Sequence, residues 1–495
     1  MGLKCVIDRD AVSGSGACVT SAHRKTPSPT SPASFRIPDS RIRRLLSSHS
    51  EDTLRPMPPE DQKFPEPTPS GRHGKPFQAP RGARDFYPED MARRQYIFDA
   101  WRKTALRHGF DEIDGPTFEH LDLYTVKSGE GIVNELFSFR RAGGETDFAL
   151  RPEFTPTLAR MVAAKANSLP KPIKWFSVGN FFRAERPQRG RLREFSQWNV
   201  DILGDESAEA DAELIACCVG ALEGFGLSSD QIRLRIGHRA AVESIFRRFE
   251  IAESNYGEWF ALLDRKPKLE QAEYVNQAQR LGFDEKRMKE LDAALDNATA
   301  TTDDDLSSLA SQLERTGVSA WTTIDLSIVR GLAYYTGMVF EVHETGGKER
   351  AIAGGGRYDN LVELFGGPPT PAVGFAMGDV VLSLVLQDRG LMPEGAELLD
   401  KIDARPDIFL ISNGQEESEA ALKPTVAELR RAGLHARHTH RTTRNVGKLL
   451  KEASSCHARY AVIIENAATC TLKNLETGEE KKDVPLDGLV VEMQG

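Results

Sequence analysis

Apolar residues are scattered without a period through residues 1–76 and become periodic only beyond them. This early stretch is rich in Ser, Pro, Thr and Arg, as in TPSPTSPASFR, and has too little apolar surface to offset the entropy of folding. We predict a disordered N-terminal extension over 1–76. Its first 50 residues are Arg- and Ser-rich, as in a transit peptide, but Asp8 and Asp10 argue against one. We favour a dispensable extension or a later start at Met57.

Between residues 81 and 226 the apolar spacing predicts a long helix followed by strands. Met91, Ile97 and Trp101 recur at helical intervals, and Gly109 is suited to end that helix. EIDGPTFE predicts a strand broken by Gly-Pro, and LRPEFTPTLAR predicts a strand that runs into a helix. Residues 171–204 predict two strands and a turn, and residues 210–226 predict a helix.

In the second half of the chain the spacing of apolar residues changes twice between helical and strand periods. Residues 240–318 are strongly charged and mostly helical in pattern, and strands return at 322–345 and 350–356. Helices are expected near Tyr358 and over 377–388, followed by a polar link over 389–405. From PDIFLIS onward strand and helix patterns alternate, which predicts a small α/β domain with a separate core.

Composition excludes some classes of protein but does not identify a function. Asp and Glu (73) outnumber Lys and Arg (64), so nucleic-acid binding would have to come from a local basic patch. Six cysteines without a CxxC pair do not form a disulfide framework in 495 residues and fit reduced thiols in the cytoplasm. No apolar run approaches the roughly 20 residues needed to cross a bilayer.

The stretch FFRAERPQRGRLREFSQWNVDILG (181–204) concentrates five arginines between Arg183 and Arg193. Pro187 and Gly190 predict the turn of a hairpin. Because side chains alternate along a strand, each strand has a mixed polar face and an apolar face. The mixed face carries Phe181, Arg183 and Glu185 on one strand and Arg193, Phe195, Gln197, Asn199 and Asp201 on the other, opposite Trp198, Val200 and Ile202.

That mixed face carries the groups of a nucleotide site. Guanidinium groups bind phosphate oxygens bidentately, and a phenyl ring stacks on a base. A glutamine with a carboxylate suits an ammonium group. The pattern is equally typical of a solvated hairpin with scattered salt bridges.

Three further stretches shift the balance towards a site. IVRGLAYYTGMVFEV (328–342) places an arginine and paired tyrosines in a β-like run, although tyrosines alone also fit a packed strand. The glycines of AIAGGGRYDNLVELFGG (351–367) leave room for a ligand close to the backbone, with a tight turn as the alternative. LRPEFTPTLAR places Glu153 and Thr155 on one predicted strand face.

In order and spacing these motifs resemble those of histidine–tRNA ligases, a family of class II aminoacyl-tRNA synthetases, over roughly residues 78–495. RGARDFYP resembles the family's opening signature, and GPTFE stands in the place of the first class II motif, which forms the dimer interface. FRAERPQRGRLREFSQ resembles the second class II motif. RGLAYYTG and GGGRYD resemble the two histidine-specific motifs.

The resemblance implies an α+β fold, with an antiparallel sheet flanked by helices, a helical insertion and a C-terminal α/β anticodon-binding domain. The implied division is a catalytic core over 77–234 and 321–398, an insertion over 235–320 and an anticodon-binding domain over 405–495. The family also implies a cytoplasmic homodimer.

The implied reaction converts ATP and L-histidine to histidyl-adenylate and pyrophosphate, and then transfers the histidyl group to the terminal adenosine of histidine tRNA. Such chemistry depends mainly on positioning and charge stabilisation. Mg²⁺ is expected on the pyrophosphate, but no dense carboxylate cluster identifies its ligands.

The resemblance also carries over residue roles. Arg183 and Arg330 are the expected catalytic residues, acting on the α-phosphate. ATP binding is expected from Arg183 (α-phosphate), Glu185 (adenine amine), Arg191 (outer phosphates) and Phe195 (adenine ring). Histidine binding is expected from Glu153, Phe154, Thr155, Arg183, Gln197, Asp201, Arg330, Tyr334 and Tyr335.

Two positions depart from the family pattern. Ala333 stands where an Asp is usual, and Val381 stands where an Arg usually clamps the γ-phosphate. Losing that guanidinium removes a charge-assisted contact of about 1.5–3 kcal/mol. Another Arg or Lys could compensate for it. The alternative function is a non-catalytic paralogue, either a regulatory subunit of ATP phosphoribosyltransferase or a tRNA-sensing module.

The C-terminal stretch HARHTH has His435, His438 and His440 without a cysteine pair or acidic partner spaced for zinc, so we assign no metal there. Basic residues around it are the expected contacts for tRNA phosphates. These are Arg437, Arg441, Arg444 and Lys448.

Overall fold

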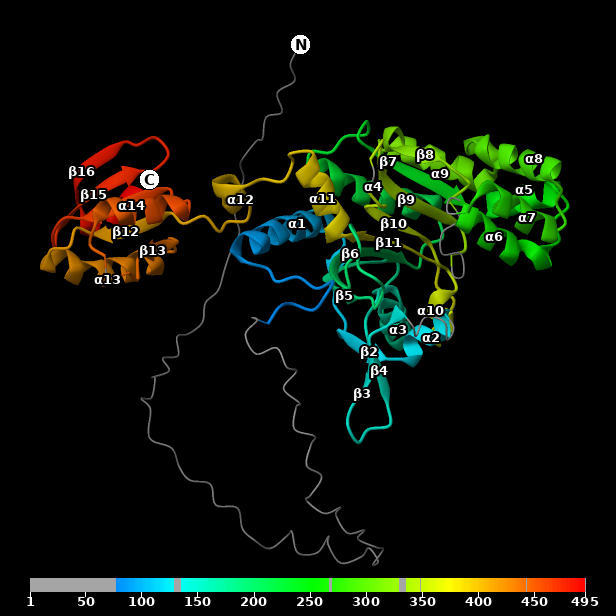
Figure 1. Cartoon of the computed structure of the whole chain (residues 1–495), viewed down its shortest axis with the longest axis horizontal. Coiled ribbons are helices and arrows are strands. Elements are labelled where there is room, and N and C mark those ends of the chain that lie inside the picture. Colours follow the sequence, from blue (N-terminus) through cyan, green and yellow to red (C-terminus); the bar gives the residue numbers. More distant parts are fainter. Residues whose placement is uncertain are drawn as a thin grey trace, which may run out of the picture. The chain divides into compact units, whose positions relative to one another are not determined.

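The computed structural model describes residues 77–128, 135–266, 269–328, 335–347, 349–441 and 443–494. The predicted extension over 1–76 lies outside the described residues, and so do Arg330, Ala333 and Tyr334. Figure 1 follows the described chain by label and colour. Within this part, no helix is both long enough and apolar enough to span a membrane.

The first helix, α1 (Pro88–Arg107), lies where the sequence predicted it. Its initial proline has a φ angle preset for a helix, and Asp90 accepts a hydrogen bond of 3.3 Å from the backbone N–H of Tyr87. Trp101 is fully buried, and Gly109 follows the helix with a φ of +74°. The apolar stripe of α1 therefore packs into the core, and glycine permits the turn that ends it.

An eight-stranded sheet forms the centre of the fold, in the order β1-β5-β6-β11-β10-β9-β7-β8. The pairs at its two edges, β1 with β5 and β7 with β8, are parallel, and the pairs between them are antiparallel. This sheet agrees with the α+β fold that the resemblance implies. Its strands are β1 (Asp111–Glu112), β5 (Ile173–Phe182), β6 (Glu194–Leu203), β7 (Ile232–His238), β8 (Thr322–Ile324), β9 (Met338–Glu344), β10 (Ala353–Arg357) and β11 (Ala372–Gly378).

One face of the large sheet packs against helices. Trp198 of β6 stacks on Trp101 of α1 with ring centroids 6.1 Å apart and meets Phe375 of β11 edge-on at 5.1 Å. A second core, on β5, buries Phe181. The helices of the first core are α1, α4 (Ala208–Gly224), α9 (Asp304–Arg315) and α11 (Asp379–Asp388), and those of the second are α3 (Thr155–Lys165) and α10 (Leu361–Leu364).

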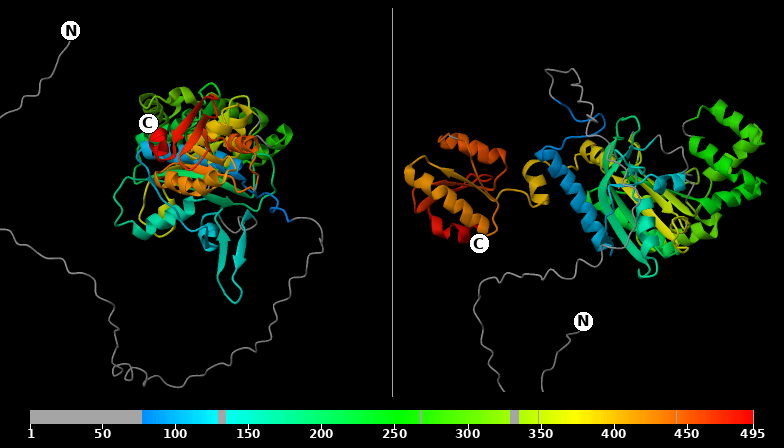
Figure 2. Two further views of the ribbon diagram at one scale, coloured as in Figure 1. Left: turned by 90° about the vertical axis from the view of Figure 1, so that its left-hand side faces the viewer. Right: turned by 90° about the horizontal axis from the view of Figure 1, so that it is seen from below.

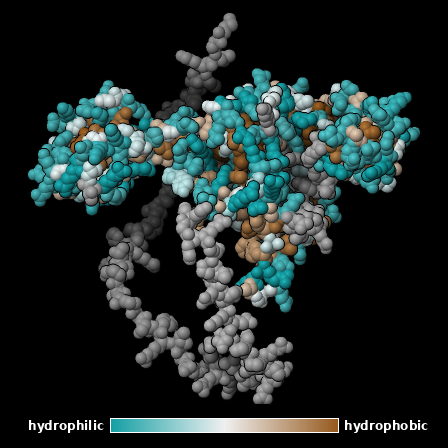
Figure 3. Space-filling view, viewed as in Figure 1, coloured by the Kyte–Doolittle hydropathy of each residue, from teal (hydrophilic) through white to brown (hydrophobic). Residues whose placement is uncertain are grey.

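A separate three-stranded sheet contains β2 (Phe118–His120), β4 (Asp147–Leu150) and β3 (Ser138–Arg140), with α2 (Asp122–Ser128) beside it. The prediction of one interrupted strand over EIDGPTFE was wrong, since β1 and β2 belong to different sheets. A proline between them cannot donate to a strand ladder. Phe118 and Phe139 are 49% and 45% exposed, and Figure 3 shows apolar side chains gathered in this region.

The charged stretch after β7 is helical, as predicted. Its helices are α5 (Arg239–Arg248), α6 (Tyr256–Arg265), α7 (Gln271–Arg280) and α8 (Glu285–Asp296), followed by α9. Trp259 and Phe283 meet with ring centroids 4.6 Å apart inside a core of their own. Figure 2 shows these helices gathered into one bundle.

A five-stranded sheet forms the C-terminal part, in the order β13-β12-β14-β15-β16. Because alternate residues of β12 point to opposite faces, each face has its own apolar cluster. The polar link predicted over 389–405 contains a helix instead, α12 (Gly395–Lys401), anchored by buried Leu398. The other elements are β12 (Ile408–Ser412), α13 (Glu416–Arg431), β13 (Ala436–His438), α14 (Val446–Ser455), β14 (Tyr460–Ile464), β15 (Thr469–Asn474), β16 (Glu480–Pro485) and α15 (Leu489–Gln494).

Candidate active site

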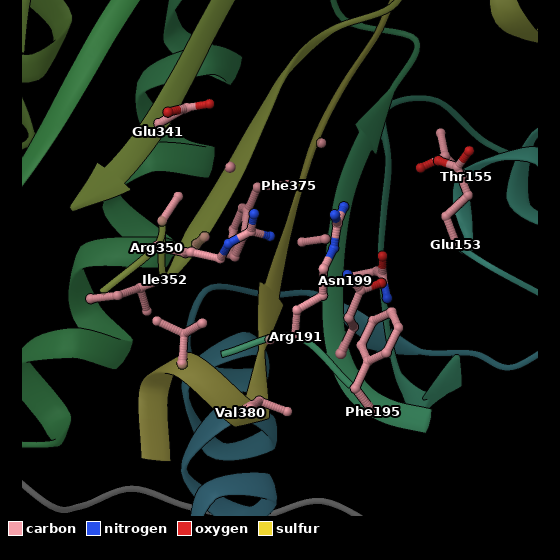
Figure 4. Close-up of a pocket in the computed structure, with 18 of the residues that line it drawn as sticks. Glu153, Thr155, Arg191, Phe195, Asn199, Glu341, Arg350, Ile352, Phe375 and Val380 are labelled. Atoms are coloured by element: carbon pink, nitrogen blue, oxygen red, sulfur yellow. The ribbon is translucent and has the colours of Figure 1, made fainter. Parts of the chain in front are cut away.

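A cavity of about 550 Å³ opens over the centre of the large sheet, where β6, β11 and β10 lie side by side. Figure 4 shows side chains from these strands and from the loops around them converging on it. Its lining includes most of the predicted site residues. They are Glu153, Thr155, Arg183, Arg191, Phe195, Gln197, Asp201 and Tyr335.

Strand β6 supplies one wall of the cavity through simple alternation. Phe195, Gln197, Asn199 and Asp201 all line it, whereas the intervening Trp198, Val200 and Ile202 belong to the apolar core beneath. The sequence predicted this division of faces, and the structure confirms it. The strand therefore presents a polar row to the cavity without disturbing the core.

Asp201 is the most deeply buried charged group of this wall, at 5% exposure. The hydroxyl of Tyr358 donates a hydrogen bond of 2.5 Å to its Oδ1. Burial raises the pKa of Asp201 to about 7, and the hydrogen bond from Tyr358 acts in the opposite direction. Asp201 can therefore change its charge near neutral pH, and a cationic ligand would favour its ionised form.

Glycines keep the space around Asp201 open. A Cβ atom on Gly374 of β11 would lie 1.9 Å from Oδ1 of Asp201. The three consecutive glycines of β10 serve two purposes. Gly354 lines the cavity, but a Cβ atom on Gly355 or Gly356 would lie 2.1 or 2.5 Å from a backbone carbonyl oxygen of a neighbouring strand. The tight-turn alternative was wrong, and only part of the triplet faces a ligand space.

Arg183 follows directly after β5 and lies beside Phe195. Its Nε donates to the carbonyl oxygen of Pro152 at 3.2 Å, and its guanidinium carbon lies 5.1 Å from the centre of the Phe195 ring. A guanidinium group beside a half-buried aromatic ring is the pairing expected from the sequence for a nucleotide. The hairpin thus brings these two groups together.

Arg191 lines the main cavity and forms an ion pair with Glu185. Glu185 itself lines a smaller adjacent cavity with Arg81 and Arg186 and not the main one. The expected contact of Glu185 with adenine therefore requires that Arg191 release it. Ligand phosphates would compete for that guanidinium.

The segment before α3 differs from the prediction. β4 ends at Leu150 and α3 begins at Thr155, so Glu153 and Thr155 do not share a strand face. Prolines on both sides of Glu153 explain why the strand does not continue. Glu153 and Thr155 still reach the cavity, but Phe154 is buried in the core under α3 and does not line it.

Several lining residues had no assigned role in the sequence analysis. Glu341 and His343 of β9 are joined by a contact of 2.8 Å between Oε2 and Nε2, and Arg350 precedes β10. Glu341 and His343 alternate along VFEVHE, a signal that could have indicated one polar face on the strand that pairs with the glycine strand. Arg350 has no comparable signal, because it stands in a polar turn.

The start of α11 is fixed by an ion pair in which Asp379 is buried and Arg84 is partly exposed. Asp379, 2% exposed, accepts hydrogen bonds from the Arg84 guanidinium at 2.7 Å and from the backbone N–H of Ser196 at 2.8 Å. The next two residues, Val380 and Val381, line the cavity. Arg84 belongs to RGARDFYP, so that segment holds the start of the helix that carries Val381.

The arginine of GGGRYD, Arg357, lies outside the cavity lining and holds segments of the fold together. Arg357 is buried, and its guanidinium donates to the carboxylate of Asp211 at 2.5 Å and to the carbonyl oxygen of Asp205 at 2.9 Å. Asp359 accepts from the Thr336 hydroxyl at 2.6 Å. These contacts join β10 to the start of α4 and to the segment that contains Tyr335.

The basic residues predicted to contact tRNA lie in the C-terminal part. Arg437 and Lys448 are exposed. Arg441 and Arg444 have 72% and 67% exposed side chains and form long ion pairs of 3.6 and 3.5 Å with Glu452 and Glu419. Exposed pairs of this length contribute little, so all four cations remain accessible to an anionic partner.

Comparison with known proteins gives one consistent result. A sequence model described as histidyl-tRNA synthetase matches residues 82–379. The chain is 40% identical to the histidine–tRNA ligase of Opitutus terrae over 408 residues, 78% of this chain and 90% of that relative. It is 39% identical to that of Haloarcula marismortui over 433 residues, 83% and 96% of the two chains.

Solved structures agree in fold. The histidyl-tRNA synthetase of Nostoc sp. superposes with a TM-score of 0.70 at 24% identity, covering 85% of this chain and 99% of that one. A protein of Bacillus halodurans described as an ATP phosphoribosyltransferase regulatory subunit/histidyl-tRNA synthetase superposes with a TM-score of 0.62 at 25% identity, covering 76% and 97%.

Proposed function

The chain belongs to the histidyl-tRNA synthetase family, and from this membership we propose that it is a histidine–tRNA ligase that attaches L-histidine to its tRNA with ATP. In the first step the histidine carboxylate attacks the α-phosphorus of ATP, forming histidyl-adenylate and releasing pyrophosphate. In the second step a ribose hydroxyl of the tRNA terminal adenosine attacks the activated carbonyl carbon and releases AMP.

The observation that carries this proposal is the single cavity that gathers the predicted residues. They come from a loop before α3, from the arginine hairpin, from β6 and from the segment before β9. A solvated hairpin would not bring Gln197, Asp201 and Tyr335 to the lining of one cavity. The chain therefore retains the polar groups that two different small substrates require.

For ATP, we assign the adenine ring to Phe195 and the α-phosphate to Arg183, which lies against that ring. Arg191 would leave Glu185 for the outer phosphates, and Glu185 would then be able to accept from the adenine amine. Guanidinium groups form charge-assisted hydrogen bonds with phosphate oxygens and so neutralise the charge that develops as the phosphoanhydride breaks.

Mg²⁺ is expected to accompany the pyrophosphate, where it would neutralise charge on the leaving group. The cavity lining contains the carboxylates Glu153, Asp201 and Glu341. With the first two assigned to histidine, Glu341 is the oxygen donor that fits the ion, because Mg²⁺ prefers one or two carboxylates together with phosphate oxygens.

For histidine, we assign the cationic groups to Asp201, Gln197 and Glu153, with Thr155 and Tyr335 completing the pocket. Asp201 is buried, so its ionised form gains most when a positive charge is beside it. Arg330 and Tyr334 keep the roles that the resemblance implies, and Phe154 would act only through the core that positions its two neighbours.

Two partners complete the proposal. The basic residues of the C-terminal part would contact phosphates of the tRNA, with the anticodon-binding role assigned to residues 405–495. A second copy of the chain is expected as well, and the exposed aromatic residues Phe118 and Phe139 are consistent with a covered surface near the first class II motif. A cytoplasmic location stays a prediction.

The paralogue alternative is not favoured. Regulatory relatives generally lack the C-terminal domain, whereas this chain has a five-stranded sheet there with two apolar clusters. The cavity also contains Arg183, Arg191, Gln197 and Asp201, to which we assign the two small substrates.

The proposal is tested by histidine-dependent exchange of labelled pyrophosphate into ATP, followed by aminoacylation of tRNA. We expect exchange from the wild-type chain, loss of exchange in Arg183→Ala, and wild-type rates in Arg248→Gln, which alters an exposed arginine on α5. A folded wild-type chain that binds tRNA without any exchange would establish the paralogue instead.

A further inference from the structure

The cavity contains an arginine that the sequence analysis did not assign. Among the described lining residues, the guanidinium groups are those of Arg183, Arg191 and Arg350. Arg183 is held by a backbone carbonyl and Arg191 by Glu185. No hydrogen bond or ion pair with another described residue engages Arg350, and the neighbouring Glu349 is paired with Arg189 at 2.5 Å.

Arg350 stands beside the position that lacks the expected arginine. A Cβ atom built on Gly190, in the turn of the hairpin, would lie 3.4 Å from Cγ2 of Val381 and 3.9 Å from Cδ of Arg350. Both side chains therefore border the same residue of the turn. Arg350, Val380 and Val381 all line the cavity.

The direction of Arg350 fits an anion at this end of the cavity. Figure 4 shows Arg350 extending towards the middle of the cavity from one side, with Phe195 on the other side and Arg191 between them in this view. If adenine lies on Phe195, a nucleotide that extends towards Arg350 places its outer phosphates between two guanidinium groups. Glu341, the labelled carboxylate on the same side of the cavity as Arg350, is in contact with His343.

We propose that Arg350 binds the outer phosphates of ATP opposite Arg191 and supplies, from the turn before β10, the guanidinium that Val381 does not provide. This assignment rests on the proposed function and deepens it. A guanidinium group binds phosphate oxygens in a bidentate manner. Because the arginine side chain is long, a residue on a neighbouring element can place this group at the same phosphates.

Isothermal titration calorimetry with ATP and with AMP, at one fixed Mg²⁺ concentration, tests the assignment. In Arg350→Gln we expect the dissociation constant for ATP to rise about 10- to 100-fold, the loss of a charge-assisted contact. The constant for AMP, which has no outer phosphates, should change less than about twofold. Arg350→Lys should fall between wild type and Arg350→Gln, and Arg248→Gln should match wild type.

The outcomes separate this inference from the proposed function. Equal ATP affinity in wild type and Arg350→Gln overturns it, and so does an equal loss for ATP and AMP or a wild-type chain that binds ATP no more tightly than AMP. Absence of histidine-dependent exchange in a wild type that discriminates ATP from AMP sinks the ligase proposal, while calorimetry still decides the role of Arg350. Thermal melting confirms that each variant is folded.

Discussion

The phenol hydroxyl of Tyr358 donates a hydrogen bond of 2.5 Å to the carboxylate of Asp201, joining the residue after β10 to the C-terminal end of β6. Tyr358 is itself buried, at 2% exposure. The pair therefore sits at the floor of the cavity, where water cannot stabilise the negative charge of Asp201. When Asp201 is ionised so that it can bind a cationic ligand, the free energy of unfolding is lower.

Asp201→Asn should make the chain more stable at alkaline pH. Because the folded-state pKa of Asp201 is about 7 and its ordinary value is 3.8, the folded state binds more protons between those values. The free energy of unfolding therefore falls as pH rises through that window. We expect equal melting temperatures near pH 4 and a gain for the variant at pH 8, with an upper limit of about 4 kcal/mol.

The same variant should lose histidine binding, which calorimetry measures. If the variant is less stable than wild type at pH 8, the negative charge of Asp201 does not destabilise the ligand-free protein.

Tyr358→Phe should move the pH dependence of histidine use. In the wild-type chain, kcat/KM for histidine is expected to rise with pH through about 7, as Asp201 loses its proton. Removing the hydroxyl removes the hydrogen bond that lowers the pKa of Asp201, so the rise should shift to higher pH. Titration of free histidine is common to both proteins, so the difference between their midpoints reports the enzyme. Coincident profiles would exclude this role of Tyr358.

Gly374→Ala should close the pocket for histidine. The added methyl group would meet the Asp201 carboxylate at 1.9 Å, so that side chain or β11 must shift. We expect the KM for histidine to rise by more than about tenfold, since roughly 1.4 kcal/mol of lost contact suffices. Gly478→Ala is a control for the methyl group, because nothing lies within 4 Å of a Cβ atom there, although its φ of +79° adds some strain.

Breaking the pair of Arg84 and Asp379 should destabilise the fold. Arg84→Ala leaves a carboxylate that is 3% exposed with a single backbone donor, so we expect a loss of roughly 2 to 4 kcal/mol in urea denaturation. Adding Asp379→Asn should recover part of that loss, since the unpaired charge is then gone. Losses that simply add in the double variant would mean that the two groups are not coupled.

Arg441→Ala with Arg444→Ala should weaken tRNA binding without affecting adenylate formation. Each removed phosphate contact lowers the number of released counterions, so the dependence of the tRNA dissociation constant on salt should become shallower. Pyrophosphate exchange should stay at the wild-type rate. An unchanged KM for tRNA at low salt would remove these arginines from the interface.

Local patterns predicted the parts of the site that lie on regular strands. The alternation along β6 placed Gln197 and Asp201 in the cavity and Trp198 in the core, because a strand leaves no other choice. Glu153 was placed on a strand wrongly, since the apolar run before it hid the effect of two prolines. The short helix α12 was missed because a single buried leucine gives no period.

Contacts between distant segments lay beyond sequence reasoning. Asp379 has no partner in its own neighbourhood and meets Arg84 only because α11 ends up beside the opening segment. Arg350 has no periodic context at all. Its role depends on which turn lies opposite it, and that is decided by the order of strands in the sheet.

That strand order also governs when the site can form during synthesis. β6 pairs early with β5, but its other neighbour, β11, begins only at Ala372. At roughly 5–20 residues per second a ribosome takes about 10 to 30 s to add the intervening chain. Throughout that interval the edge of β6 that later pairs with β11 lacks its partner strand. The nascent protein is thus most exposed to misassembly and most in need of chaperones before its last core strand emerges.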